Sequence, residues 1–302
     1  MDKLSLRKLL VKTLALFTVI RSYNIAMLML AQYMASLFIF NEGKNHLEIL
    51  FDKNLSFIVI ASALSAAAGY IINNFYDLEK DAIDRPLQHY IERFISQNFK
   101  LNVYLGLNIL ALGIAYFASW RVMIFFFVYQ FLVWFYSHKI NKIVWLNNIY
   151  SVILMVFPFF ALFIYYENLA SIIFLHAGFL FMLLLITDIL KDFTSATADT
   201  IYNYSTLPVI YGEKKTKTIL TILIILNSAL AAYMGYDSDT GYMRYFFLFS
   251  SMLMLLLLIP LLSSRSKTNY KILHLTFKLL IGFGIFNMVF IDINPLALQK
   301  II

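Results

Sequence analysis

The stretch IINNFYDLEKDAIDRP, residues 71–86, joins an apolar run to a dense group of charges. The uncharged run extends from Leu55 to Tyr76, and the charged residues that follow it are Asp77, Glu79, Lys80, Asp81, Asp84 and Arg85. A helix of about 20 apolar residues crosses the hydrocarbon core of a bilayer. The stretch therefore predicts a membrane helix that ends in a group of mostly acidic side chains at the water boundary.

Apolar runs of the same kind recur along the rest of the chain. Hydrophobic residues make up 61% of the 302 residues, which is more than a soluble domain usually holds. The runs long enough to span a membrane, the last of them interrupted by Lys278, are Ser22–Asn41, Leu55–Tyr76, Leu101–Trp120, Val122–His138, Ile143–Tyr166, Asn168–Thr187, Thr218–Tyr236, Tyr245–Ser264 and Ile272–Ile291. We therefore expect an all-α, multi-pass membrane protein with about nine transmembrane helices. No linker rich in Gly, Ser or Pro divides the chain, so residues 1–302 are expected to form a single domain.

Lysine and arginine residues concentrate in the connections on one side of these spans. The basic groups lie within residues 3–21, 80–100, 139–142, 191–217 and 265–271. Cytoplasmic loops carry such an excess, so we expect the N-terminus in the cytoplasm and, after nine spans, the C-terminus outside. The net charge of +7 is then a signal of topology, and no basic patch indicates a nucleic-acid partner. The chain has no cysteine, which excludes disulfides and thiolate chemistry.

The first acidic motif follows the second span. Asn73, Asp77 and Asp81 are four residues apart. A helix brings side chains at this spacing onto one stripe, about 6 Å apart along its axis. Three oxygen-bearing side chains are therefore expected to share one face of a helix at the cytoplasmic boundary.

The second acidic motif, TDILKDFTSATAD at residues 187–199, follows the sixth span. Asp188 and Asp192 are four residues apart, and Asp199 follows seven residues later, with Ser195 between them. A carboxylate at the centre of a bilayer costs about 2.5–3.5 kcal/mol, so these groups belong in a wet cavity or near the interface. Clustered carboxylates repel one another, and a hard divalent metal with a phosphate ligand offsets that repulsion. From spacing alone, solvated helix ends remain an equally good interpretation.

Several segments resemble the UbiA superfamily of intramembrane prenyltransferases. Residues 73–81, NNFYDLEKD, are similar to its N-D-x-x-D-x-x-x-D motif, and Arg85-Pro86 continue the likeness. The second motif resembles K-D-I-x-D-x-x-G-D, and STLPVIYG at 205–212 resembles T-L-P-V-x-x-G. FYSHKIN at 135–141, Asn148, and RSYN at 21–24 also match segments of that family. The likeness therefore extends from residue 21 to residue 212.

The resemblance implies a bundle around a central cavity open to the cytoplasm. It also implies two Mg²⁺ ions that bridge the acidic motifs to an isoprenyl diphosphate, whose isoprenyl group is transferred to an aromatic, quinone-precursor or lipid acceptor. The metal ligands expected on this basis are Asn73, Asp77, Asp81, Asp192, Ser195 and Asp199, and the catalytic residues are Asp77, Asp81, Asp192 and Asp199. The substrate-binding residues are expected to be Arg21, Asn24, Arg85, Tyr136, Ser137, Lys139 and Lys191. Each cation among them has an equally good interpretation as an ordinary positive-inside residue.

The chain departs from the family pattern in both acidic motifs and in the connection after the first, where Gln88, His89 and Arg93 stand in place of the family's second R-P and its glycine. Asn74 and Ser195 stand where the family has aspartate, and Ala198 stands where it has glycine. Asp192, three residues before Ser195 and on the same helical face, is expected to compensate for the carboxylate missing there. These departures leave a second function open, an intramembrane terpene cyclase that ionises the same diphosphate without an acceptor. A transporter or a membrane scaffold that holds a polar cavity is a more remote alternative.

Overall fold

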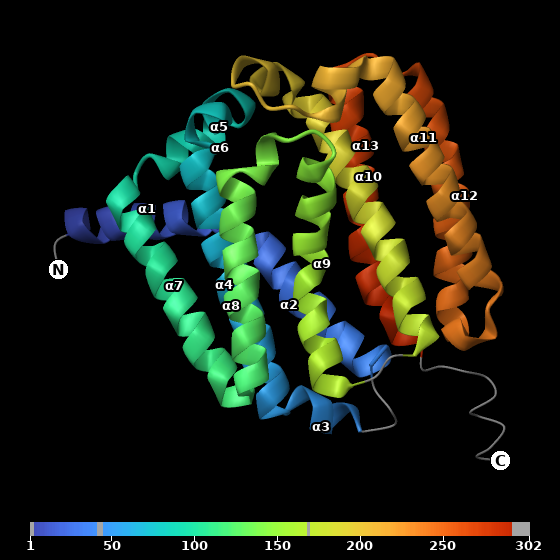
Figure 1. Cartoon of the computed structure of the whole chain (residues 1–302), viewed down its shortest axis with the longest axis horizontal. Helices are drawn as coiled ribbons and strands as arrows, with labels where there is room; N and C mark the ends of the chain where they lie inside the picture. Colours follow the sequence, from blue (N-terminus) through green and yellow to red (C-terminus); the bar gives the residue numbers. More distant parts are fainter. Residues whose placement is uncertain (1–2, 41–44, 168–169, 292–302) are drawn as a thin grey trace. The chain divides into compact units, whose positions relative to one another are not determined.

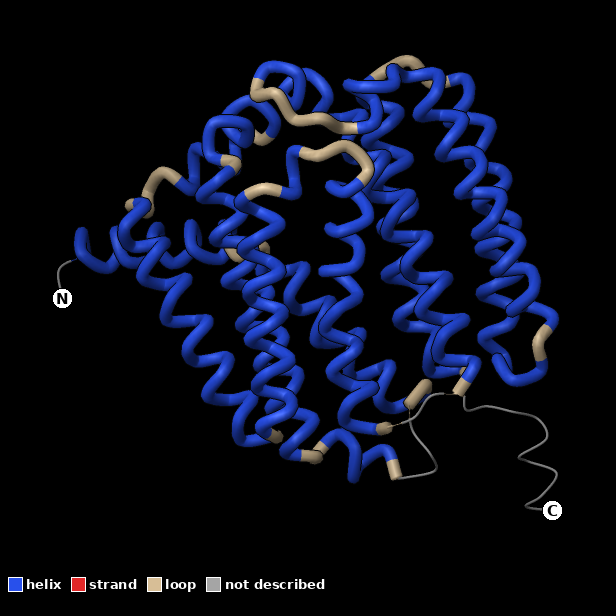
Figure 2. The backbone as a smooth tube through the Cα atoms, viewed as in Figure 1, coloured by secondary structure: helices blue, strands red, loops and turns tan. Residues whose placement is uncertain are grey.

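The computed structural model describes residues 3–40, 45–167 and 170–291, and within these ranges every regular element is a helix (Figure 2). The α-helices are α1 (Lys3–Val19), α2 (Ser22–Phe38), α3 (His46–Leu50), α4 (Lys53–Tyr76), α5 (Leu78–Asp84), α6 (Pro86–Glu92), α7 (Gln97–Ala118), α8 (Trp120–His138), α9 (Leu146–Tyr166), α10 (Ser171–Ile201), α11 (Leu207–Tyr236), α12 (Arg244–Ser263) and α13 (Lys267–Asn287). Short 3₁₀ helices cover Ile140–Lys142, Ser238–Met243 and Met288–Phe290. The all-α prediction is confirmed.

Eight helices in the described part of the chain are long and apolar enough to cross a membrane, namely α4 and α7 to α13. The number reaches the expected nine if Val11–Val19 and Ser22–Phe38, which meet at a bend of 55°, form one span. The bend lies at Arg21, whose backbone has a φ of 49°. The number of spans thus depends on the first one, and not on the last run, which qualifies despite the interruption by Lys278. The span ends expected at Asn41 and Asn168, and the C-terminus, lie outside the described residues.

The packing divides the chain into two compact units, each built from two segments: residues 1–30 with 51–141, and residues 31–50 with 142–302. Helix α2 contributes to both units, because the boundary falls between Leu30 and Ala31. Within the first unit α4 packs against α7 and α8. Close packing there depends on small residues, since a Cβ atom added at Gly69 would come within 2.8 Å of Val133. Whether the whole chain behaves as a single domain stays a prediction.

In the second unit α10 packs against α9, α11 and α13, and α11 and α12 lie side by side (Figure 1). Its core is a contiguous cluster of buried apolar side chains along these helices, including Leu183, Ile186, Leu220 and Phe247. Side chains such as Ile222, Met252 and Ile259 face outward and are exposed, as expected of helix surfaces in contact with lipid.

The two charged connections of the sequence analysis are largely helical. Residues 77–100 contain α5 and α6, with Pro86 as the first residue of α6, where its missing N–H costs no helical hydrogen bond. The second motif does not lie in a loop either, because it continues α10 without a break to Ile201. A helix of 31 residues is about 46 Å long, which exceeds the ~30 Å of a bilayer core. Part of α10 therefore extends beyond the hydrocarbon.

Candidate active site

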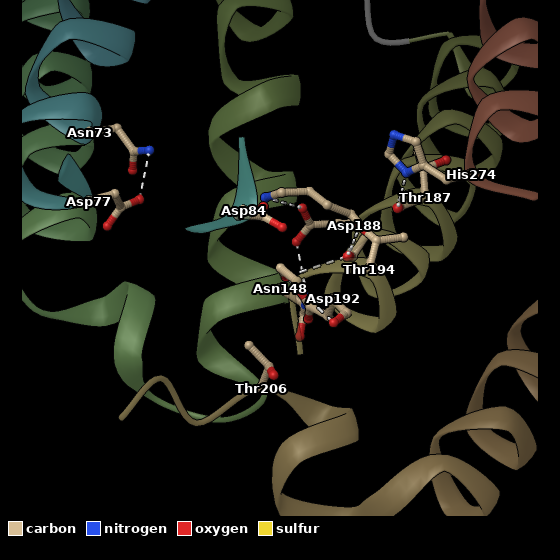
Figure 3. Close-up of polar contacts among 12 residues, drawn as sticks. Asn73, Asp77, Asp84, Asn148, Thr187, Asp188, Asp192, Thr194, Thr206 and His274 are labelled. Atoms are coloured by element: carbon tan, nitrogen blue, oxygen red, sulfur yellow. Dashed lines mark hydrogen bonds and ion pairs between the residues drawn. The ribbon is translucent and has the colours of Figure 1, made fainter. Parts of the chain in front are cut away.

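The first acidic group lies in the first unit, where α4 ends. Asn73 donates a hydrogen bond through Nδ2 to Asp77 Oδ2 at 3.0 Å, as the four-residue spacing predicts (Figure 3). Asn141 donates to the other carboxylate oxygen, Asp77 Oδ1, at 3.3 Å. Asp77 is not inside a continuous helix, since it ends α4 and precedes α5. The expected stripe of three is therefore broken there, and Asp81 belongs to the next helix.

The guanidinium groups of Arg85 and Arg21 lie near this carboxylate group. Arg85 Nε is 4.0 Å from Asp81 Oδ1 and 3.8 Å from Asp84 Oδ2. Arg21 lies over the Tyr70 ring, 5.1 Å from its centroid, and is close enough to Asp81 for an electrostatic interaction. Both arginines expected to bind the substrate therefore accompany the first acidic group.

The second acidic group lies in the second unit, on α10 and α9. Asn148 donates through Nδ2 to Asp188 Oδ2 at 3.0 Å and to Asp192 Oδ2 at 2.8 Å, so that one amide bridges two carboxylates (Figure 3). Lys191 Nζ is 3.8 Å from Asp188 Oδ1. Asn148, Asp188 and Asp192 are all buried. Two carboxylates in such surroundings are stable only with nearby donors or cations.

Asp199 is fully buried, two turns beyond Asp192 on α10. Ser195 donates its hydroxyl hydrogen to Asp199 Oδ2 at 2.9 Å, and Thr206 donates to the same oxygen at 3.3 Å. Thr206 occupies the N-cap position of α11, but its side chain makes no cap hydrogen bond. The T-L-P segment therefore contacts the second motif through Asp199.

The other expected substrate-binding residues are more scattered. Asn24 on α2 and Tyr136 on α8 are half-buried, and Lys139 is exposed just after α8. Ser137 is buried and donates its hydroxyl hydrogen to Val133 O in its own helix at 3.1 Å. A role for these residues in substrate binding stays a prediction.

Four residues that were not expected among the site residues complete the two groups, namely Asn141, Asn148, Asp188 and Thr206. Asn141 and Thr206 lie in the segments FYSHKIN and STLPVIYG, and Asn148 matches a family position, so each carried a sequence signal. Asp188 also had a signal, its four-residue spacing from Asp192. Which carboxylate each amide contacts depends on packing over tens of residues, and spacing alone does not predict it.

The donor atoms fit a hard divalent cation. Among the described residues no three His, Asp or Glu side chains gather as a ready metal site, but each acidic group offers oxygen ligands only, which Mg²⁺ prefers. The Oδ1 atoms of Asn141 and Asn148 are buried without a hydrogen-bond partner. In the second group the amide N–H atoms lie between two carboxylates, where positive charge is favoured. Rotation of the Asn148 side chain would place its Oδ1 atom between the carboxylates instead. Both acidic groups thus offer oxygen ligands, and both suit Mg²⁺.

Comparison with known proteins identifies the family of the chain. Residues 26–281 match the model of the UbiA prenyltransferase family. Digeranylgeranylglyceryl phosphate synthase from Saccharolobus solfataricus is 26% identical over 195 residues, which cover 61% of this chain and 67% of that protein.

Solved structures show the same fold. A digeranylgeranylglyceryl phosphate synthase structure superimposes with a TM-score of 0.68 at 20% identity, over 93% of this chain and 98% of that one. A UbiA homologue from Archaeoglobus fulgidus bound to GPP and Mg²⁺ superimposes with a TM-score of 0.67 at 14% identity, over 92% and 99% of the two chains. The family match covers most of the sequence, and the chain belongs to the UbiA prenyltransferase family.

Proposed function

We propose that this membrane protein transfers an isoprenyl group from a prenyl diphosphate to a hydrophobic acceptor in a reaction that requires Mg²⁺. The observation that carries the proposal is the buried pair Asp188 and Asp192, held together by the amide of Asn148. Burial of charged groups usually adds no net stability over well-packed apolar side chains. It is well suited to a cation that arrives with an anionic substrate.

The proposed role of each residue follows from the charge of its side chain. The carboxylates of Asp77, Asp81, Asp188, Asp192 and Asp199 would hold the cations. Arg85 and Lys191 contribute fixed positive charge beside them. Bound Mg²⁺ supplies the positive charge that stabilises the departing diphosphate. The bond from the isoprenyl carbon to the diphosphate oxygen breaks and a bond to the acceptor forms, which gives prenylated acceptor, diphosphate and a proton. We propose two ions because the chain has two acidic groups.

A glyceryl phosphate lipid is the acceptor class that we propose. The relatives named above are digeranylgeranylglyceryl phosphate synthases, and their name describes a glyceryl phosphate product. The alternatives are an aromatic acid or a quinone precursor. We also propose that the N-terminus and both acidic motifs face the cytoplasm, and that the C-terminus lies outside, since basic residues concentrate beside the motifs.

The experiment is a product analysis of the purified protein in lipid nanodiscs. C10, C15 and C20 prenyl diphosphates are each incubated with a glyceryl phosphate monoether, with an aromatic acid, or with no acceptor, and the products are identified by mass spectrometry. We expect a prenylated glyceryl phosphate that forms with Mg²⁺ and not in EDTA. A prenylated aromatic acid would replace the proposed acceptor, and a cyclic hydrocarbon without acceptor would identify a terpene cyclase. Intact diphosphate in every mixture would contradict the enzyme function.

A further inference from the structure

A buried polar triad lies next to the first acidic motif in the first unit. Asn74, in the last turn of α4, donates through Nδ2 to Glu92 Oε2 at 2.6 Å and accepts a hydrogen bond on Oδ1 from Lys100 Nζ at 2.8 Å. Asn74 is 5% exposed, Glu92 7% and Lys100 1%. The amide therefore joins a carboxylate and an ammonium group that are both removed from bulk solvent.

Burial of these charges must be offset by their contacts. A buried ion pair often contributes little net stability, whereas removal of one partner is strongly destabilising because the other charge remains. Lys100 interacts electrostatically with Glu92 and with Asp81, and Arg21 interacts with the same two carboxylates. Glu92 thus contributes to the balance of charge around Asp81. The hydrogen bond that Glu92 accepts comes from the amide of Asn74.

The triad also fixes a segment of the chain. Glu92 is the last residue of α6, and Lys100 lies in the first turn and a half of α7. Both side chains return to Asn74 on α4, so the triad holds the two ends of the α6–α7 connection against α4. The segment that begins at the end of α4 and is held at Glu92 carries Asp81 and Arg85, which the proposed function uses.

We propose that Glu92 is a positioning residue for the first acidic group, acting through Asn74 and Lys100. Glu92 places a buried carboxylate against Asn74 from a different helix, and the resulting triad sets where Asp81 and Arg85 stand relative to Asp77. The claim that Glu92 supports catalysis rests on the proposed function. The contacts among Asn74, Glu92 and Lys100 can be tested without an activity assay.

The structure allows a test in which the amide at position 74 and the carboxylate at position 92 exchange places. In Asn74→Asp, two carboxylates face each other across 2.6 Å with no hydrogen atom between them. In Glu92→Gln, the positive charge of Lys100 loses the buried counter-charge that acts on it most strongly. In the double variant Asn74→Asp/Glu92→Gln, the new amide can donate to the new carboxylate, and Lys100 can donate to that carboxylate as well. Both hydrogen bonds and the single negative charge then return. Asn98→Asp and Glu79→Gln are matched controls, because both residues are exposed and lie in the same region.

Two readouts separate positioning from a merely structural role. The first is binding of Mn²⁺, as a probe for Mg²⁺, measured by electron paramagnetic resonance on folded, monodisperse protein. The second is the Mg²⁺ concentration for half-maximal activity, together with kcat at saturating Mg²⁺. We expect each single variant to weaken Mn²⁺ binding and raise the half-maximal Mg²⁺ concentration by about tenfold. The double variant should return to within about threefold of the wild type, and the controls should not change.

Two results would overturn the proposal. One is a double variant as impaired as the worse single variant. The other is single variants with lower melting temperatures but unchanged Mn²⁺ affinity in the folded protein, which would make the triad a structural contact only. If the wild type shows no transferase activity, the proposed function fails, whereas the Mn²⁺ and melting measurements still decide whether Glu92 and Asn74 exchange roles. The two failures are therefore distinguishable.

Discussion

The amide nitrogen of Asn148 lies 2.8 Å from Asp192 Oδ2 and 3.0 Å from Asp188 Oδ2, and it donates one hydrogen bond to each (Figure 3). The two aspartates are one turn apart on α10, whereas Asn148 is on α9. Without this donor, two buried carboxylates would face each other with no hydrogen bond between them. The contact therefore holds an acidic pair ready for a cation.

Replacement of Asn148 by leucine should destabilise the protein chiefly when no divalent metal is present. The variant loses hydrogen bonds to two buried carboxylates, so its melting temperature in EDTA should fall by about 2–6 °C. Added Mg²⁺ should recover part of that loss, because a cation offsets the same repulsion. Differential scanning fluorimetry in detergent measures both quantities. Asn108→Leu is the control, since Asn108 donates to Tyr104 O in its own helix and not to a carboxylate, and an equal response to EDTA in both variants would disprove the role of the amide.

Loss of charge at Asp192 should damage the reaction as severely as loss of charge at Asp199. Asparagine at either position retains an acceptor for the existing hydrogen bonds, so folding should persist while cation binding is lost. We expect kcat to fall at least about a hundredfold in each variant. Wild-type turnover by Asp192→Asn would show that Asp192 does not compensate for the missing carboxylate at Ser195.

Thr206→Val should have a smaller effect on activity than either aspartate substitution. It removes the hydroxyl group of Thr206 that donates to Asp199 Oδ2, and the hydroxyl of Ser195 remains. A loss of one hydrogen bond to a charged group lowers activity by about ten- to a hundredfold if the carboxylate must stay ionised and fixed. The assay is kcat for the purified variant at saturating Mg²⁺. Activity equal to that of the wild type would mean that the contact from the T-L-P segment does not support Asp199 in catalysis.

Asp77→Asn should abolish most activity while the protein still inserts and folds. Asn73 and Asn141 donate to different oxygens of the Asp77 carboxylate. The amide oxygen of asparagine can accept from one of them, so the charge and one of these hydrogen bonds are removed. We expect turnover to drop by about 10²-fold or more. Glu79→Gln, two residues away and exposed, is the control that removes a charge from the same segment. Similar activity in the two variants would contradict a specific role for Asp77.

Substrate should protect the connection between α6 and α7 from trypsin. Arg93 is exposed and lies in the turn after α6, which makes it an accessible cleavage site. If the segment 77–100 closes over a bound diphosphate to exclude water, a non-hydrolysable diphosphate analogue with Mg²⁺ should slow cleavage after Arg93. Gel analysis of timed digests, with and without the analogue, measures the effect. Unchanged cleavage would argue against closure of this segment.

Local periodicity predicted the parts of the site that lie within one helix. The spans follow from apolar runs, and the contact between Asn73 and Asp77 follows from their four-residue spacing. The rule assumes one continuous helix and does not extend to Asp81, because α4 ends before Asp77 and Asp81 lies in α5. No periodicity shows where a helix ends. The first span is a second example. A bend of 55° at Arg21 separates Val11–Val19 from Ser22–Phe38, and the pattern of apolar residues does not predict that bend.

Spacing along the sequence does not predict contacts between distant segments. Asn148 is 40 and 44 residues from its two carboxylate partners, and Asn141 is 64 residues from Asp77. In the sequence, Glu92 and Lys100 look like ordinary charged residues of a connection between spans, yet both are buried against Asn74. Nothing in the sequence around Asn74 predicts that a carboxylate from another helix contacts it.

The central claim is that the acidic groups hold divalent cations needed to ionise a prenyl diphosphate. The most direct measurement is the rate of diphosphate release from a C20 prenyl diphosphate by the reconstituted protein, with the proposed acceptor present, as Mg²⁺ is titrated from EDTA to saturation. We predict no release in EDTA, a saturable rise with Mg²⁺, and no such rise in the Asp77→Asn and Asp192→Asn variants. Release at the same rate in EDTA, or unimpaired release by both variants, would contradict the account.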